Sequence, residues 1–320
     1  MKQSLRIVSV RALMSVGLVI FAVLNLIGCR SKTDISVTEG RARIGSAEIY
    51  YKIVGSGTPT FILHGGPGDT HDTMLQLQDL ADQYRLIFYD QRAAGRSTGD
   101  ADTANHTVEQ FVEDLEQLRQ QLAPEKINLI GGSWGALLAL QYAMKYSENI
   151  SSLVIMSTTG IRAEAMESFS AIKESRRTTA DSLALEEIFA SDGFQRRLPE
   201  SWEKFWRVYF RSYCYNPTYA DSIHLWLRDT TWTAVPGRYA GLGRFFRNYD
   251  LAPGLNRITC PTLIIYGDYD MTPLEWVRPI ADGIPGARLE IVPNAGHWVW
   301  VEATDQVTTL IREFFTAQRP

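Results

Sequence analysis

Residues 129–135 limit the fold of this chain more than any other stretch. A short apolar segment, residues 127–130, runs through Gly-Gly-Ser-Trp-Gly into a segment rich in alanine and leucine. The glycines two positions before and after Ser133 fit a sharp turn with a strained serine backbone, because larger side chains would collide there. A helix starting directly after the serine would point its N-terminal amides at the same place and favour negative charge. The pattern predicts a strand, a nucleophile elbow at Ser133 and a helix.

Apolar strand patterns alternate with helical patterns along most of the chain. Predicted strands cover residues 43–54 (a pair), 60–63, 85–89, 127–130, 152–156, 261–266 and 288–292. Besides the helix after the elbow, predicted helices cover residues 72–83, 108–122 and 305–317. Thr107 and Gln110 have the spacing of a capping box at the start of the second of these. Such alternation favours an α/β fold, with a mostly parallel central sheet and helices on both faces.

The alternation stops near Gly160 and resumes near Pro261. The residues between are helical in pattern and crowded with aromatic side chains, among them Trp202, Phe205, Trp206, Tyr209, Phe210, Tyr213 and Trp226. We interpret residues 161–257 as an inserted helical cap, which divides the α/β core into residues 43–160 and 258–320. Most of the aromatic residues are expected to pack within the cap or onto the core, and a few to line a pocket.

The first 28 residues have the pattern of a secretion signal. Lys2, Arg6 and Arg11 occur without any acid and are followed by an apolar run over residues 12–27. The run ends in Leu-Ile-Gly-Cys, similar to a bacterial lipobox, so residues 1–28 are predicted to be a lipoprotein signal peptide and Cys29 the lipidated N-terminus. An uncleaved membrane anchor is the alternative, although a spanning helix needs about 20 apolar residues.

These features predict an exported, membrane-anchored bacterial lipoprotein of the cell envelope, facing the periplasm in a Gram-negative organism. Residues 29–42 are polar and irregular, and we interpret them as a spacer between the lipid and the globular part. Two further cysteines, Cys214 and Cys260, could form a disulfide in an oxidising compartment, but two buried thiols are the preferred interpretation.

The charge of the chain does not suggest a nucleic-acid partner. There are 32 basic and 36 acidic residues, and loss of the three basic residues of the signal peptide would make the protein more acidic. None of the five histidines belongs to a cluster with metal-ligand spacing. No metal and no cofactor is therefore predicted.

Ser133, Asp270 and His297 each follow a predicted strand. Since the carboxyl ends of parallel strands meet at one edge of a sheet, these side chains are expected to lie together. In this arrangement His297 takes the serine proton during attack, and Asp270 holds the imidazole tautomer and stabilises its charged form. Asp268 is the other carboxylate of the same turn, and we prefer Asp270 because it is better placed to reach across the sheet.

Two other loops contribute to the predicted site. Residues 64–68 read His-Gly-Gly-Pro-Gly, a loop whose exposed backbone amides suit the second donor of an oxyanion hole, the first being the amide of Trp134. The charged turn after the strand 85–89 carries Asp90 and Arg92, which we expect to pair and to brace the floor of the site without taking part in the chemistry.

Together these motifs resemble the α/β-hydrolase superfamily, and within it the proline iminopeptidase group of serine peptidases. The resemblance rests on His-Gly-Gly-Pro-Gly at 64–68, Asp-Gln-Arg at 90–92 with Gly95 and Ser97, and Gly-Gly-Ser-Trp-Gly at 131–135. It implies the triad Ser133, Asp270 and His297 under a helical cap, with the amides of Gly66 and Trp134 as the oxyanion hole. It also implies removal of an N-terminal residue, often proline, from peptides, with acidic cap residues holding the free amine.

The chain departs from the group's pattern at two places. Ala93-Ala94 stands where the group usually has glycine first, and no cap motif matches its amine-binding glutamates, although Glu200, Glu203, Asp221 and Asp229 are available. The leading hypothesis is a membrane-tethered serine aminopeptidase that acts through an acyl-enzyme. The alternatives are a carboxylesterase or lactonase acting on small acyl substrates, and a non-catalytic binding module; the serine at 133 disfavours relatives with an aspartate nucleophile.

Overall fold

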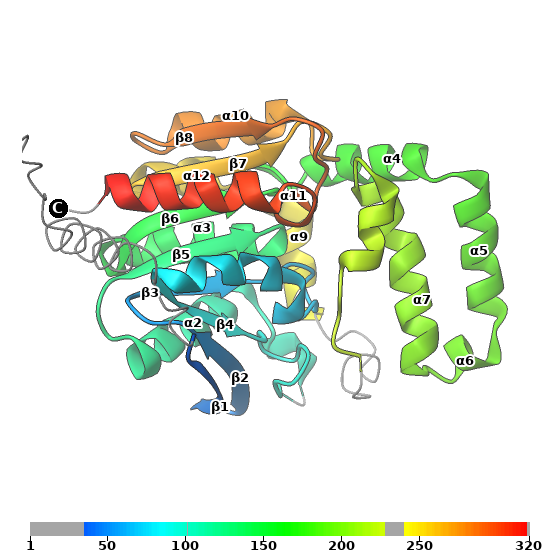
Figure 1. Ribbon diagram of the computed structural model, residues 1–320, viewed down its shortest axis with the longest axis horizontal. Coiled ribbons are helices and arrows are strands. Elements are labelled where there is room, and N and C mark those ends of the chain that lie inside the picture. The colour runs from blue at the N-terminus through cyan, green and yellow to red at the C-terminus, as the bar shows by residue number, and fades with distance from the viewer. Residues whose placement is uncertain (1–34, 101, 228–239, 319–320) are drawn as a thin grey trace, which may run out of the picture. The chain divides into compact units, whose positions relative to one another are not determined.

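A sheet of eight strands runs through the part of the chain that the computed structural model describes, residues 35–100, 102–227 and 240–318 (Figure 1). The strands are β1 (Val37–Ile44), β2 (Ala47–Val54), β3 (Thr58–Leu63), β4 (Tyr84–Tyr89), β5 (Ile127–Gly132), β6 (Ile150–Met156), β7 (Thr262–Gly267) and β8 (Arg288–Val292). Their order in the sheet is β1-β2-β4-β3-β5-β6-β7-β8. β2 is antiparallel to both of its neighbours, and the other pairs are parallel.

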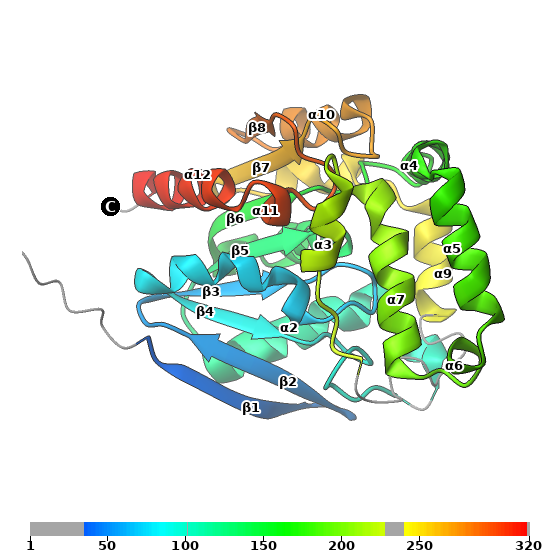
Figure 2. The ribbon, with the colours of Figure 1, turned by 45° about the vertical axis from the view of Figure 1, so that its right-hand side comes forward.

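Helices cover both faces of this sheet (Figures 1 and 2). The core helices are η1 (His71–Asp82), η2 (Thr103–Asn105), α2 (Val108–Leu122), α3 (Trp134–Tyr146), η3 (Ser147–Asn149), α10 (Leu274–Gly283), α11 (Val299–Glu302) and α12 (Thr304–Ala317). The side chain of Thr107 accepts a hydrogen bond from the Gln110 amide at 3.3 Å, which confirms the predicted start of α2. The helix predicted over 72–83 is wound as 3-10 turns.

Successive residues of the central strands pack on opposite faces, as the period of a strand requires. Phe61 of β3 belongs to a core shared with α2, α3 and α10. Its neighbour Ile62 belongs to a second core, shared with η1, α11 and α12. The predicted fold class, a mostly parallel sheet between two layers of helices, is therefore confirmed.

The predicted spacer over residues 29–42 is wrong at its C-terminal end, because β1 begins at Val37. Among the described strands β1 lies at the edge of the sheet and pairs with β2 alone, and one of its faces is open to solvent. Polar residues such as Glu39 and Arg41 are exposed on it, so the segment lacks the apolar signal of a buried strand.

The described residues between β6 and β7 form mainly helices and helical turns. They are α4 (Ala165–Arg176), α5 (Thr179–Ala190), α6 (Asp192–Gln195), α7 (Pro199–Tyr209), η4 (Phe210–Tyr213), η5 (Pro217–Ser222), η6 (Ala240–Leu242), α9 (Gly243–Asn248) and η7 (Ala252–Arg257). Rings from α6 and α7 pack on each other, with the centroids of Phe194 and Trp202 4.4 Å apart. η4 contacts the core, where the ring centroids of Phe210 and Trp298 are 4.9 Å apart.

Cys214 and Cys260 are free and buried, which confirms the interpretation as two thiols. Burial raises the pKa of both above the ordinary value for a thiol. The predicted signal peptide, residues 1–28, and Cys29 lie outside the described residues, so export and lipidation stay predictions. Within the described ranges, no helix has both the length and the apolar character needed to cross a membrane.

Candidate active site

Ser133 lies in the turn between β5 and α3 with φ 55° and ψ −120°, so the predicted backbone strain is present. Packing explains the glycines on either side. A Cβ on Gly135 would stand 2.3 Å from the carbonyl oxygen of Leu63, and a Cβ on Gly131 would stand 2.3 Å from the carbonyl oxygen of Gly135. Any side chain at these positions would push the turn away from β3 or from itself.

The structure brings Ser133, His297 and Asp270 into one hydrogen-bonded chain. His297 Nδ1 lies 3.0 and 3.1 Å from the two carboxylate oxygens of Asp270, and His297 Nε2 lies 2.9 Å from Ser133 Oγ. A carboxylate can only accept, so Nδ1 carries the proton and Nε2 accepts from the serine hydroxyl. Asp268, the other carboxylate of the turn, accepts from the Asn294 amide instead. This geometry is that of a nucleophile, a base and the group that orients the base.

Cap residues hold the histidine in place, a role that the sequence offered no way to assign. The rings of Phe169 and Tyr213 meet the His297 imidazole at steep angles, with centroids 5.2 and 5.8 Å away. The His297 amide donates to the carbonyl of Tyr213 at 2.8 Å. His297 is 2% exposed, so this packing leaves its ring little freedom to move.

A buried network joins the three motif loops. The Gln91 amide donates to His64 Nε2 at 2.9 Å, and the Gln91 side chain donates to the His64 carbonyl at 2.8 Å. Trp134 Nε1 in turn donates to Gln91 Oε1 at 2.8 Å. Burial lowers the pKa of His64 to about 4, so its ring is uncharged and Nε2 is free to accept. His64 is structural, as predicted, whereas the role of Gln91 was missed.

The predicted ion pair between Asp90 and Arg92 is wrong. Asp90 accepts from His71 Nδ1 at 2.7 Å and from the Arg96 amide at 2.8 Å. Arg92 makes a bidentate pair with Asp114 of α2, at 2.7 and 2.6 Å. The two side chains brace the turn toward different helices, which their closeness in the sequence does not reveal.

Asp90→Asn is expected to lower the free energy of unfolding by about 3 kcal/mol at pH 7, because it removes the buried carboxylate charge that faces Arg96 and accepts from His71. Burial alone would raise the pKa of Asp90, but the hydrogen bond from His71 and nearby positive charge lower it from 3.8 to about 2. A carboxyl group whose pKa is lower in the folded than in the unfolded protein stabilises the fold at any pH above its unfolded-state pKa. This stabilisation is lost as the pH falls through the folded-state pKa. The difference in free energy of unfolding between wild type and variant, measured with urea, should therefore become smaller from pH 4 toward pH 2.

Asp82→Asn is the matched control for this measurement. Asp82 forms an exposed ion pair with Arg312 at 2.7 Å, and exposed pairs contribute less than about 1 kcal/mol. Equal losses in the two variants would contradict the bracing role of Asp90.

His71, Asp72 and Asp90 form the group of potential metal ligands found among the described residues. Arg96 already lies against this group, with its guanidinium 2.7 and 3.1 Å from the carboxylate oxygens of Asp72. We interpret the cluster as a buried ion-pair network in which the arginine supplies the positive charge.

A cavity of about 300 Å³ opens onto Ser133 and His297. Its core side is formed by the loop at Gly66, and Phe169 and Lys173 of α4 and the aromatic residues of α7 and η4 form its cap side. Gly66 lines the cavity and Trp134 begins α3 directly after the serine. That their amides bind a carbonyl oxygen stays a prediction.

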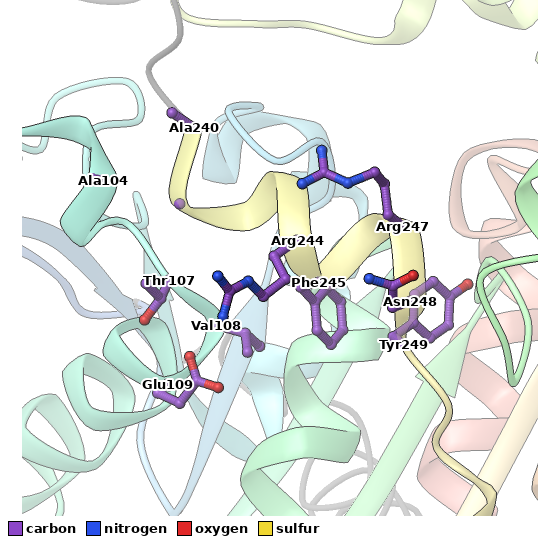
Figure 3. A pocket seen from close by; sticks show the side chains of 11 residues that line it. Ala104, Thr107, Val108, Glu109, Ala240, Arg244, Phe245, Arg247, Asn248 and Tyr249 are labelled. Atoms are coloured by element: carbon purple, nitrogen blue, oxygen red, sulfur yellow. The ribbon is translucent and has the colours of Figure 1, made fainter.

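A larger cavity of about 630 Å³ lies elsewhere, and Ser133, His297 and Asp270 are not among the residues that line it (Figure 3). It lies between the start of α2 and α9, where Arg244 points toward Glu109 and Tyr249 forms part of the wall. Size alone would favour this cavity, but only the smaller one holds a nucleophile next to a base. We therefore place the candidate active site at Ser133.

Comparison with known proteins agrees with the fold and shows a hydrolase family. The alpha/beta hydrolase fold family matches residues 59–304. A proline iminopeptidase of Saccharolobus solfataricus is 30% identical, over 88% of this chain and 93% of the relative. The crystal structure of a proline iminopeptidase from Mycobacterium smegmatis is similar with a TM-score of 0.68 at 21% identity, over 88% of this chain and 98% of that one. A thermophilic esterase from Thermogutta terrifontis has a TM-score of 0.61 at 25% identity, over 88% and 100%.

Proposed function

Because the chain belongs to the alpha/beta hydrolase fold family, we propose that this hydrolase is a serine aminopeptidase that releases an N-terminal residue, often proline, from small peptides. The observation that carries the proposal is the hydrogen-bonded chain from Ser133 through His297 to Asp270 at the base of a small cavity. The similarity to proline iminopeptidases supports the choice of an aminoacyl substrate.

In this proposal Ser133 Oγ attacks the carbonyl carbon of the first residue while its proton passes to His297 Nε2. Asp270 stabilises the resulting imidazolium, and the amides of Gly66 and Trp134 receive the oxyanion. His297 then gives its proton to the leaving amine, so that the peptide departs and an acyl-enzyme remains. Water, activated by the same histidine, attacks the acyl-enzyme and releases the amino acid.

The cavity favours a substrate with a small acyl part. Its volume of about 300 Å³ is at the lower end of the range for ligand pockets. α4 and α7 form part of its wall, and Phe169 and Tyr213 pack beside the histidine. A single residue with its free amine fits such a space better than the middle of a long chain does.

A carboxylesterase or lactonase is the second candidate, and the composition of the cavity wall favours it. Much of the wall is aromatic, and the cap acids Glu200, Glu203 and Asp221 do not line it. The likeness to the thermophilic esterase is consistent with that activity on this fold.

The two candidates are separated by the rates of the purified protein on proline p-nitroanilide and on p-nitrophenyl butyrate. An aminopeptidase is expected to hydrolyse the anilide with a higher kcat/KM than N-acetylproline p-nitroanilide, which lacks the charged amine. A protein inert on every aminoacyl anilide but active on the ester would replace the first candidate by the second.

A further inference from the structure

An aminopeptidase has to hold a positively charged amine close to the reacting carbonyl. The cap acids that the structure describes are not placed to do this. Glu203 forms an exposed pair with Arg207, and Asp221 lines a different cavity. Glu200 does not line the cavity at Ser133, and Asp229 lies outside the described residues. None of the three cap acids that the structure describes therefore lines the cavity at Ser133.

Asp69, directly after the glycine loop, lines the cavity at Ser133 and is only 8% exposed. Within the described residues its carboxylate has no hydrogen-bond or ion-pair partner. Other buried acids do have partners, such as His71 for Asp90 and Arg92 for Asp114. An unpaired carboxylate in a buried site is costly, and a ligand of opposite charge would remove that cost.

The position of Asp69 suits the amine of an N-terminal residue. Gly65 separates it from the nucleophile: a Cβ at Gly65 would stand 3.1 Å from Asp69 Oδ2 and 3.2 Å from Ser133 Cβ. The distance between Asp69 Oδ2 and Ser133 Cβ is therefore no greater than the sum of these two distances. In an aminoacyl group a single carbon separates the amine nitrogen from the carbonyl carbon, so the amine of a substrate attacked by Ser133 comes within reach of this carboxylate.

We propose, resting on the aminopeptidase function above, that the carboxylate of Asp69 binds the protonated α-amine of the substrate's first residue. The ligand class is thus a small primary or secondary ammonium with an acyl group one carbon away. Asp69 takes over the role that the group's pattern assigns to acids of the cap, and it does so from the core loop that also carries Gly66.

The charged and titratable groups around the carboxylate are consistent with this role. Burial raises the pKa of Asp69 to about 7, with the charge of His297 opposing the rise. Burial also raises the pKa of Tyr213, so its hydroxyl stays neutral. Lys173 across the cavity bonds to the Tyr209 hydroxyl and pairs with Glu174. Because the ammonium needs the ionised carboxylate, KM for an amine substrate should rise as pH falls below about 7.

Asp69→Asn tests the proposal in the full-length protein. Its kcat/KM for proline p-nitroanilide is expected to fall roughly 10- to 150-fold, mainly through KM, the loss typical of a hydrogen bond to a charged group. The ratio of anilide to butyrate ester turnover should fall with it, and the preference for the free over the N-acetylated anilide should disappear. Glu203→Gln, an exposed cap acid, is the matched control and should leave all three quantities unchanged.

The outcomes separate this proposal from the function beneath it. A wild type that cleaves the anilide, together with an Asp69→Asn variant that keeps the wild-type ratios, overturns the role of Asp69 and leaves the aminopeptidase standing. A wild type inert on aminoacyl anilides overturns both. Equal loss on anilide and ester, with loss of fluorophosphonate labelling at Ser133, shows a structural role and also overturns the proposal. If the variant does not fold, KM of the wild type decides: a rise below pH 7 for the anilide but not for the ester supports Asp69, and its absence refutes it.

Discussion

Ser133→Ala is expected to lower kcat on the best substrate by about a million-fold, the loss typical when the nucleophile of a serine triad is removed. The hydroxyl lies 2.9 Å from His297 Nε2 on a strained turn, and it is the nucleophile that the described residues place beside this base. The methyl side chain of alanine cannot form the acyl-enzyme. The turn and the cavity remain, so the residual rate reflects substrate binding and oxyanion stabilisation alone.

Two measurements check this prediction. Initial rates on proline p-nitroanilide and p-nitrophenyl butyrate give the loss, and intact mass after treatment with a fluorophosphonate shows whether one residue is labelled. Ser175→Ala, an exposed serine of α4 that does not line the cavity, is the control and should keep both rate and labelling. If Ser133→Ala retained more than about one per cent of the activity, the proposed acyl-enzyme mechanism would be wrong.

Asp270→Asn is expected to lower kcat by about ten-thousand-fold with little change in KM, as for other triads whose carboxylate becomes an amide. The carboxylate accepts from His297 Nδ1 and so leaves Nε2 as an acceptor for the serine proton. An asparagine amide turned toward Nδ1 donates to it instead, which moves the imidazole proton to Nε2. The histidine then cannot take the proton of Ser133.

Asp268→Asn provides a control of the same chemistry from the same turn. Its side chain accepts from the Asn294 amide at 2.9 Å and does not contact His297, so the variant should stay within a few-fold of wild type. Steady-state kinetics of both variants on one substrate checks the assignment. A large loss at Asp268 with a small one at Asp270 would reverse it.

Local patterns predicted most of the fold. The strands of the central sheet and the helices α2 and α12 were expected within a few residues of where they lie. The spacing of apolar residues in these elements follows from the burial of one or both of their faces, so neighbouring residues of the sequence show it. The start of β1 was missed, because an edge strand with an exposed face carries polar residues.

The candidate site was predictable where the signal was backbone geometry. Gly131 and Gly135 are required by contacts of the turn with itself and with the carbonyl of Leu63, so the sequence around Ser133 shows the elbow directly. The choice of Asp270 over Asp268 also agrees with the contact to His297. The prediction was wrong for the ion pair of a long side chain that can reach several acids: Arg92 pairs with Asp114 of α2 rather than with Asp90, two residues away in the sequence.

The sequence by itself determined the α/β class, the strained serine and the edge of the sheet where the candidate triad gathers, because backbone sterics and strand periodicity act between neighbours in the chain. Only the tertiary structure decided which acid faces the nucleophile unpaired and which rings enclose the histidine. Asp69 looks like any polar loop residue in the sequence, and its burial beside Ser133 arises when β3, β5 and the cap meet. Burial and charge pairing depend on segments far apart in the chain, and only the folded protein brings those segments together.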